Sequence, residues 1–263
     1  MPVLNHPCFG QVPCGTVGRI HLPVAPSCNV QCNFCDRKYD CVNESRPGVT
    51  SELLAPVRAV ERVRAALERE PRIGVAGIAG PGDALDNDET FETLKLVHEA
   101  FPQLLLCLST NGLLGSSRLE QLLSCHVNTM TVTVLASTPA TASLIYERIR
   151  IGDTWMPGGE AAQRLLEAQR KTISICSMEG IIVKVNTVLI PGINDGEIGS
   201  IARMAEASGA SIMNVIGLIP CGHMSDRPAP TPEQLKAAQA QAESHLPVFT
   251  NCHKCRADAC GML

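Results

Sequence analysis

Short apolar segments alternate with longer amphipathic segments along the chain from residue 19 to residue 244. The short segments have the length and apolar character of strands. They are residues 19–25, 73–79, 104–109, 127–135, 181–190 and 211–218. The longer segments repeat apolar residues with the spacing of a helix. They are residues 55–70, 88–101, 116–124, 139–149, 159–179, 195–208 and 231–244, with Asp88 expected to cap the second.

This alternation predicts an α/β fold in which parallel strands are joined by right-handed crossovers. A flat doubly wound sheet would carry a glycine-rich phosphate loop after its first strand. Cysteines stand at that place here, which favours a (βα) barrel, complete or partial. The 263 residues fit one domain. We expect an N-terminal flap over 1–18, a barrel over 19–244 and a C-terminal tail over 245–263.

Charge and hydropathy exclude two kinds of partner. The chain has 22 basic and 26 acidic residues and a formal net charge of −4, so no broad basic face is available for nucleic acid. It shows no run of eighteen apolar residues and no leader pattern at its start. We therefore expect a cytoplasmic protein that binds neither nucleic acid nor membrane.

Cysteine usage points to metal. Thirteen cysteines are too many for a reducing compartment unless several bind metal, because cytosolic disulfides are rare. Cys28, Cys32 and Cys35 are spaced so that one loop can direct three thiols at one point. A cubane iron–sulfur cluster normally takes four thiolates, so three would leave one iron open to a small molecule. A structural zinc site is the alternative, although it usually needs four ligands in paired Cys-x-x-Cys knuckles.

The Cys-x-x-x-Cys-x-x-Cys spacing, with Phe34 before the last cysteine, resembles the signature of the radical S-adenosylmethionine (SAM) superfamily. The resemblance implies a TIM-like barrel. It also implies a [4Fe-4S] cluster on Cys28, Cys32 and Cys35 whose open iron binds the methionine part of SAM. One electron then cleaves the sulfonium to a 5′-deoxyadenosyl radical.

Polar and glycine residues gather where the predicted strands end, which is where βα barrels place their active sites. Exposed carbonyls of Gly80 and Gly82 could bind the α-amino group of SAM, because glycine lets backbone approach a ligand closely. The other candidates for the cofactor are Asp83, Ser109, Asn111, Thr133, Asn186 and Ile193. Turn chemistry alone could explain each of these residues singly.

The remaining cysteines divide into candidate ligands and packing residues. Cys252 and Cys255 form a Cys-x-x-Cys pair, which would be a redox dithiol in a thioredoxin-like context that is absent here. The candidates to complete further metal sites are His6, Cys8, Cys41 and Cys107. His6 and Cys8 could instead belong to a disordered tail, and Cys107 could pack as a small hydrophobe. Cys125 and Cys176 are predicted to pack, and Cys14, Cys221 and Cys260 stay unassigned.

Longer motifs narrow the resemblance to the NifB family of nitrogenase cofactor maturases. These motifs include His-Pro-Cys at 6–8, Glu-Ser-Arg-Pro-Gly at 44–48 and Cys-His-Lys-Cys-Arg-Ala-Asp at 252–258. The others are residues 25–35, 37–43, 77–83, 108–112, 183–186 and 190–195. Ala84 stands where the family usually has proline, and residues 136–159 match weakly.

The NifB resemblance implies a lyase-type maturase of nitrogen fixation. Two further [4Fe-4S] clusters would be fused with an added sulfur and a carbide derived from a SAM methyl group. Six residues would hold these substrate clusters, namely His6, Cys8, Cys41, Cys107, Cys252 and Cys255. Glu44 would be a labile ligand or proton-transfer group, and Arg46 would contact an anionic cluster.

The same resemblance implies the partners, which are a cluster donor, a reductant and a separate carrier that receives the product. The carrier is expected because the chain lacks the C-terminal carrier domain of some members. One alternative is a radical SAM enzyme acting on a peptide or small metabolite with an auxiliary cluster. Another is an iron–sulfur scaffold or carrier, against which the loops at residues 80–83 and 109–112 argue, because a scaffold needs no nucleoside pocket.

Overall fold

A computed structural model of the chain describes residues 5–9, 15–41, 48–250 and 257–262. Its main sheet has seven strands in the order β10-β1-β3-β4-β5-β8-β9. They are β1 (Gly18–His21), β3 (Ile73–Ile78), β4 (Leu105–Thr110), β5 (Thr129–Thr133), β8 (Ile182–Leu189), β9 (Ile212–Gly217) and β10 (Cys260–Met262). The six strands from β1 to β9 in this sheet are parallel, and β10 pairs antiparallel with β1.

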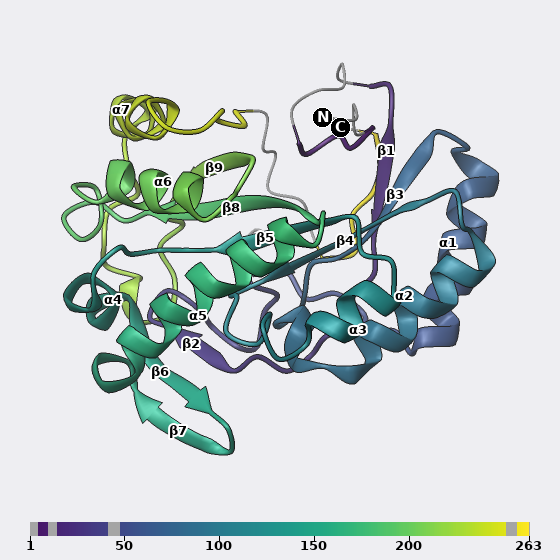
Figure 1. The fold of residues 1–263 in the computed structure, drawn as a ribbon, viewed down its shortest axis with the longest axis horizontal. Coiled ribbons are helices and arrows are strands. Elements are labelled where there is room, and N and C mark those ends of the chain that lie inside the picture. The colour runs from purple at the N-terminus through teal and green to yellow at the C-terminus, as the bar shows by residue number, and fades with distance from the viewer. Residues whose placement is uncertain (1–4, 10–14, 42–47, 251–256, 263) are drawn as a thin grey trace.

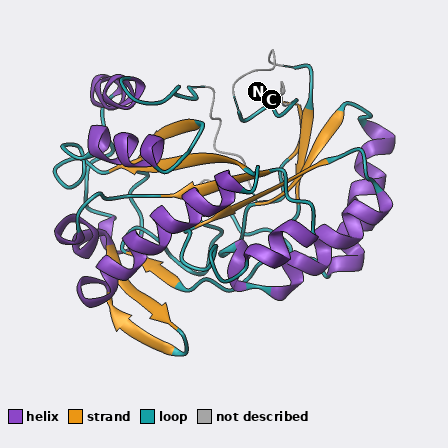
Figure 2. Cartoon of the chain, viewed as in Figure 1, coloured by secondary structure: helices purple, strands orange, loops and turns teal. Residues whose placement is uncertain are grey.

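Helices follow the strands and cover the outside of the sheet (Figures 1 and 2). They are α1 (Pro56–Arg69), α2 (Asp88–Ala100), α3 (Leu119–Ser124), α4 (Pro139–Ile145), α5 (Gly158–Met178), α6 (Ile198–Ala207) and α7 (Pro232–Glu243). Two 3-10 turns, η1 (Ala84–Asp86) and η2 (Gly222–Met224), follow β3 and β9. The predicted α/β fold is confirmed as a partial barrel. Its open edges among the described residues are β9 and β10.

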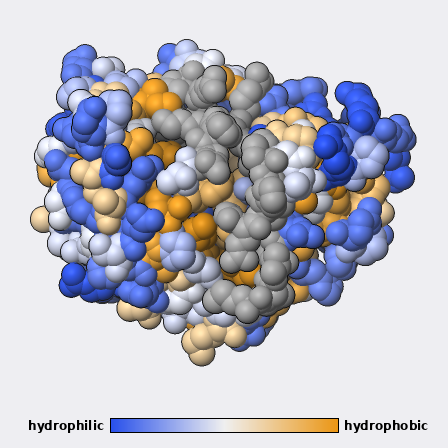
Figure 3. All heavy atoms as spheres, turned by 90° about the horizontal axis from the view of Figure 1, so that it is seen from above, coloured by the Kyte–Doolittle hydropathy of each residue, from blue (hydrophilic) through white to orange (hydrophobic). Residues whose placement is uncertain are grey.

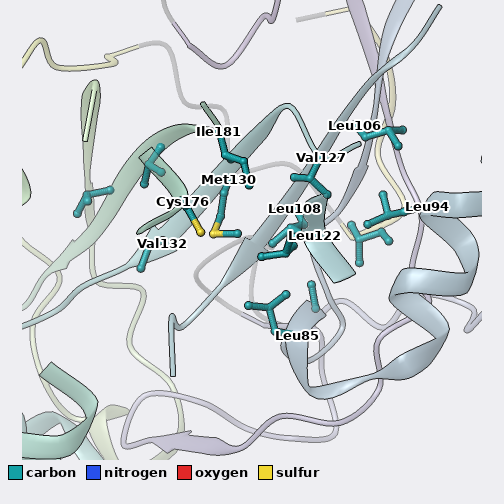
Figure 4. Close-up of a cluster of buried hydrophobic side chains, with 14 of the residues drawn as sticks. Leu85, Leu94, Leu106, Leu108, Leu122, Val127, Met130, Val132, Cys176 and Ile181 are labelled. Carbon is teal, nitrogen blue, oxygen red and sulfur yellow. The ribbon is translucent and has the colours of Figure 1, made fainter. Parts of the chain in front are cut away.

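Strand alternation separates a hydrophobic outer face from a polar inner face. On β4, Leu106 and Leu108 are buried against the helices, while Cys107 and Ser109 lie on the other face and are half-buried. The same alternation on β8 sends Val183 and Val185 outward into this core. Figure 4 shows Leu85, Leu94 and Leu122 of the helical layer packed against side chains of β4 and β5. The inner face is thus free to carry polar and sulfur side chains.

One predicted helix is wrong in part. The helix expected over 139–149 ends at Ile145, and the chain continues as an antiparallel hairpin of β6 (Tyr146–Ile151) and β7 (Thr154–Pro157). Tyr146 and Ile149 have the aromatic and β-branched side chains that favour strands. Pairing with β2 (Val30–Cys32) gives these residues partners that a helix would not.

The cap of α2 differs from the prediction, and two packing cysteines agree with it. Asp88 is the first helical residue of α2 rather than its cap, and Asn87 occupies the cap position. Cys125 and Cys176 are buried in the main core as predicted. The hairpin of β6 and β7 extends away from the body of the molecule (Figure 1).

Candidate functional site

The three-cysteine loop is fixed in place by a small sheet of its own. The first strand, expected over 19–25, ends at His21, and Ala25 makes only an isolated bridge to Pro81. The cysteine loop then forms β2, which pairs with β6 of the hairpin. Val30 lies opposite Ile149, and Cys32 lies opposite Tyr146. The backbone of the middle cysteine is therefore held by a strand from a distant part of the chain.

A clamp of two polar side chains, Gln31 and Arg37, ties the loop together from within. Gln31 Nε2 donates to the carbonyl oxygens of Cys32 at 3.2 Å and Cys35 at 2.9 Å. Arg37 Nε donates to Gln31 Oε1 at 2.7 Å. The Arg37 guanidinium also donates to the carbonyl oxygens of Cys28, at 3.2 Å, and Val30. The clamp thus touches the backbone of all three cysteines.

The loop forms one wall of a cavity at the carboxyl ends of β3, β4 and β5. Its volume is about 690 Å³, including the part open to solvent. The predicted site residues on its wall are Cys28, Cys32, Cys35, Cys41, Gly82, Asp83, Ser109, Asn111 and Thr133. Nine residues that the sequence singled out are thereby brought together. Figure 3 shows the molecule from the side of the two chain ends, with β2 on the far side; hydrophobic residues gather in the central part of this face, with hydrophilic residues around them.

The thiols of this cavity suit a metal cluster. Burial raises the pKa of Cys28 to about 11. Burial also raises the pKa of Cys32, and the nearby Cys35, Cys41 and Cys28 raise it further. Three partly buried thiols so close that their charges would repel need positive charge nearby to be thiolates, and the iron ions of an iron–sulfur cluster supply it. Among the described residues no group of His, Cys, Asp and Glu side chains is arranged to hold a single metal ion.

Asp83 organises the strand-end loops. Its carboxylate accepts hydrogen bonds from the Leu85 amide at 2.9 Å, the Asn111 amide at 2.5 Å and the Thr110 hydroxyl at 2.9 Å. Burial raises the pKa of Asp83 to about 6, and these donors offset part of that effect. Its oxygens are therefore occupied by the fold, and its role is to join the loop after β3 to the loop after β4.

Asn111 links the loop after β4 to the cysteine loop. Its Nδ2 donates to Asn29 Oδ1 at 2.6 Å and lies 3.9 Å from Cys28 Sγ. Its Oδ1 accepts from the Leu113 amide at 2.9 Å. Gly82 makes a close backbone approach, because a Cβ there would lie 2.2 Å from the carbonyl oxygen of Ser27.

Three other predicted cofactor residues do not line the cavity. The Gly80 carbonyl accepts from the Ala25 amide at 3.3 Å, so it is engaged by the sheet. Asn186 is buried on the inner face of β8, and its Oδ1 accepts from Asn214 Nδ2 at 2.7 Å. Ile193 packs in the turn after β8 against the apolar cluster that also includes Cys28 and Cys32.

A second group of candidate ligands lies deeper inside the barrel. Phe9 packs with Ile212, Phe249, Cys8 and Cys107. Ile212 is the first residue of β9, so this group lies toward the amino ends of the strands. Cys107 and Ser109 share the inner face of β4, about 7 Å apart along the strand, which connects this group to the cavity above.

His6 belongs to the second group through its neighbour Phe9. The two rings are 4.6 Å apart, and Cys8 N donates to His6 Nδ1 at 3.1 Å. Burial, followed by the charges of Lys184 and His21, holds the pKa of His6 well below its usual range. The ring is thus neutral with its proton on Nε2. If iron bound at Nε2, the ring proton would have to move to Nδ1. Nδ1 could then no longer accept the hydrogen bond from the Cys8 amide.

Four predicted site residues, Glu44, Arg46, Cys252 and Cys255, lie outside the described residues. The described residues next to these two gaps, Cys41 and Ala257, lie beside the loop after β3. Before the first gap, the Cys41 amide donates to the carbonyl of Pro81 at 2.9 Å. After the last gap, buried Ala257 lies against Gly80.

Sequence reasoning missed the residues that support the loop, namely Gln31, Arg37, Asn29 and Thr110. Their positions within two residues of a cysteine or a strand end were the available signal. Cys221 was also missed. Burial is the largest cause of the raised pKa of Cys35, and the nearby Cys221 thiol raises that pKa further. The next residue, Gly222, lies against the backbone of the cysteine loop.

Comparison with known proteins identifies the class. The family pattern described as "Radical SAM superfamily" matches residues 22–205. The structure of SuiB from Streptococcus suis bound to S-adenosylmethionine shares the fold, with a TM-score of 0.63 at 13% identity over 91% of this chain and 52% of SuiB. The chain belongs to the radical SAM superfamily. That membership implies a [4Fe-4S] cluster and SAM, and the three partly buried thiols of Cys28, Cys32 and Cys35 fit such a cluster.

Closer relatives identify the family. FeMo cofactor biosynthesis protein NifB of Methanocaldococcus jannaschii is 44% identical over 261 residues, which cover 98% of this chain and 86% of that protein. NifB of Klebsiella pneumoniae is 43% identical over 265 residues, covering 98% of this chain and 57% of that protein. Within the superfamily, the chain belongs to the NifB family. It spans 53% to 62% of the length of several bacterial relatives.

The described helices include none that is long and apolar enough to cross a membrane.

Proposed function

We propose that this chain builds the iron–sulfur precursor of the nitrogenase cofactor from two [4Fe-4S] clusters, a SAM-derived carbide and an added sulfur. The observation that carries the proposal is the arrangement of two sulfur-bearing groups on one inner barrel wall. The cavity of Cys28, Cys32 and Cys35 lies at the carboxyl ends of the strands and is called the upper cavity. The group of His6, Cys8 and Cys107 lies toward the amino ends and is called the lower group. Ser109 and Cys107 connect the two on the same face of β4.

The upper cavity would bind the radical cluster and SAM. Cys28, Cys32 and Cys35 would hold the cluster, which when bound supplies the electron that cleaves the sulfonium of SAM. Ser109 and Thr133 lie on the cavity wall and offer hydroxyls to the polar parts of SAM. Asn111 stands beside Cys28 and offers an amide there. Gly80, Asn186 and Ile193 would act less directly, by shaping the wall on which SAM rests.

The lower group would hold a substrate cluster. His6, Cys8 and Cys107 supply few ligands, which suits a substrate that must be remodelled and released rather than locked by four thiolates. Cys41 lies on the upper cavity wall, and its amide donates to the carbonyl of Pro81, next to Gly80, against which Ala257 lies. Cys252 and Cys255 shortly precede Ala257 in the sequence. These three cysteines would hold the second substrate cluster.

Two charged residues and three partners complete the proposal. Glu44 would act as a labile ligand or proton-transfer group, and Arg46 would contact an anionic cluster. An iron–sulfur donor would load the substrate clusters, and a reductant would supply electrons. A separate carrier would receive the product. Nucleic acid and membrane have no part in the reaction.

The test is Cys107→Ala in protein reconstituted without oxygen. The variant should still form the radical cluster and produce 5′-deoxyadenosine, because Cys107 lies below the upper cavity. It should yield no product that restores activity to cofactor-free nitrogenase. Cys125→Ala is the matched control, since that thiol is buried in the outer core, and it should yield product. If Cys107→Ala yields as much product as the control, Cys107 only packs and the substrate site is wrong.

A further inference from the structure

Lys184 places a positive charge inside the barrel, on the inner face of β8. Its neighbours in sequence, Val183 and Val185, point into the outer core, so the lysine points to the interior, where its residue is only 8% exposed. Its Nζ lies 5.0 Å from the ring centre of Phe9 and 5.6 Å from that of Phe249. It also lies 3.4 Å from the carbonyl oxygen of Cys8.

These contacts leave the lysine charge without a counter-charge. Ring faces and one long carbonyl contact offset only part of the hydration that a buried ammonium loses. Among the described residues no carboxylate lies within ion-pair distance of Lys184. Buried lysines are rare unless they are paired. The barrel interior is therefore prepared for an anion that the described part of the chain does not supply.

The neighbouring side chain of His6 has one ring nitrogen without a hydrogen-bond partner among the described residues. His6 is 3% exposed, and its Nε2 makes no hydrogen bond to the described residues. Its ring packs on Phe9, the same ring over which Lys184 lies. A positive charge without a counter-charge and an N–H donor without an acceptor among the described residues thus stand together in the buried region around Phe9, which we call the chamber.

The thiols of the chamber indicate what kind of anion fits. Cys8 and Cys107 pack against Phe9 from the N-terminal segment and from β4. Thiolates and sulfides are soft ligands of iron. With the thiolates of Cys8 and Cys107 as its charged ligands, a cubane cluster becomes an anion once it is reduced by one electron, and every further sulfide or thiolate adds to its negative charge. A hydrated oxyanion would gain little from this apolar and sulfur-rich wall.

We propose that Lys184 is the counter-charge for an anionic iron–sulfur cluster bound in this chamber beside His6, Cys8 and Cys107. The inference rests on the proposed function, because that function places a substrate cluster there. Lys184 is a positioning residue in this account. It attracts the cluster by charge and, through the Cys8 carbonyl and the Phe9 ring, holds the segment that carries His6 and Cys8.

The experiment isolates the substrate clusters by removing the radical cluster. In a Cys28→Ala, Cys32→Ala, Cys35→Ala background, protein-bound iron reports only the other sites. Adding Lys184→Met should lower the iron content by about four per chain, the content of one cubane. Lys184→Arg keeps the charge and should retain that iron. Any cluster that remains in Lys184→Met should have a more negative reduction potential, which a purely structural role would not cause.

Phe249→Leu is the packing control, because it removes a ring from the lysine but leaves every charge in place. It should retain the iron. Full iron and an unchanged potential in Lys184→Met would overturn the assignment of Lys184. Loss of the iron in Phe249→Leu as well would overturn it too, since packing would then be the cause. If the triple-alanine background itself binds no iron, the substrate-cluster part of the proposed function fails, and this inference fails with it.

Discussion

At the scale of single residues, the loop cysteines and the strand-end polar residues could be predicted because their spacing and position carry the signal. Cys28, Cys32 and Cys35 need only a short loop to face one point. Gln31 and Arg37 could not be assigned in the same way. Their role depends on which carbonyls come within reach once β2 has formed, and a sequence pattern does not contain that information.

Arg37 offers a direct test of the clamp. Arg37→Ala removes the hydrogen bonds to Gln31 and to the carbonyls of Cys28 and Val30. A hydrogen bond from a charged donor contributes about 2 kcal/mol. We therefore expect the radical cluster to be lost to a chelator roughly 30-fold more readily, at about 1.4 kcal/mol per tenfold change. Iron release and 5′-deoxyadenosine formation measure the effect.

Arg164→Ala is the control for charge, since Arg164 is exposed on α5. It should release iron at the rate of the unaltered protein. Equal release from the two variants would show that the clamp contributes nothing to cluster retention.

Gly82 tests how closely the loop after β3 must approach the cysteine loop. An alanine Cβ would lie 2.2 Å from Ser27 O and 2.6 Å from Ser27 C. Backbone must move to relieve such overlap, so Gly82→Ala should lower the free energy of unfolding by roughly 3 kcal/mol. Denaturant unfolding of the iron-free, reduced protein measures it. Gly196→Ala has open space around the new Cβ and should change stability by less than about 1 kcal/mol. Similar values for both would mean that the approach is not tight.

At the scale of elements, the barrel strands and most helices could be predicted to within a few residues. The spacing of apolar residues and the length of each segment match the face that the segment buries. The segment at 139–149 could not. Its apolar spacing fits a helix, and only pairing with β2 makes Tyr146–Ile151 a strand. That pairing joins residues more than a hundred positions apart, which local propensity does not record.

Ile149 tests whether the hairpin supports the cysteine loop. It is fully buried opposite Val30, so Ile149→Ala should cost about 3 kcal/mol of unfolding free energy. It should also speed hydrogen exchange at the amides of β2. Leu144→Ala, at a side chain 56% exposed, should change stability by no more than about 0.5 kcal/mol. Unchanged exchange in β2 would contradict the proposed support.

At the scale of the whole molecule, the parallel order and the carboxyl-end cavity followed from the βα alternation. The sequence also predicted that His6, Cys41 and Cys107 could hold one cluster inside the barrel. His6 and Cys107 do lie in the group around Phe9, but Cys41 lies on the wall of the upper cavity. It could not show that Lys184 joins them. A lysine in a strand reads as an exposed residue until the inner face of the barrel is known.

The proposed function requires that one chain hold a radical cluster and two substrate clusters together, at the two levels of the barrel. An electron-transfer enzyme of the same fold would need fewer clusters, and the difference appears directly in the metal content. The decisive measurement is the iron content per chain of the full protein reconstituted with iron and sulfide without oxygen. We expect roughly 12 irons per chain, from three cubanes. A content of about eight or fewer, in protein that still cleaves SAM, would contradict the proposed function.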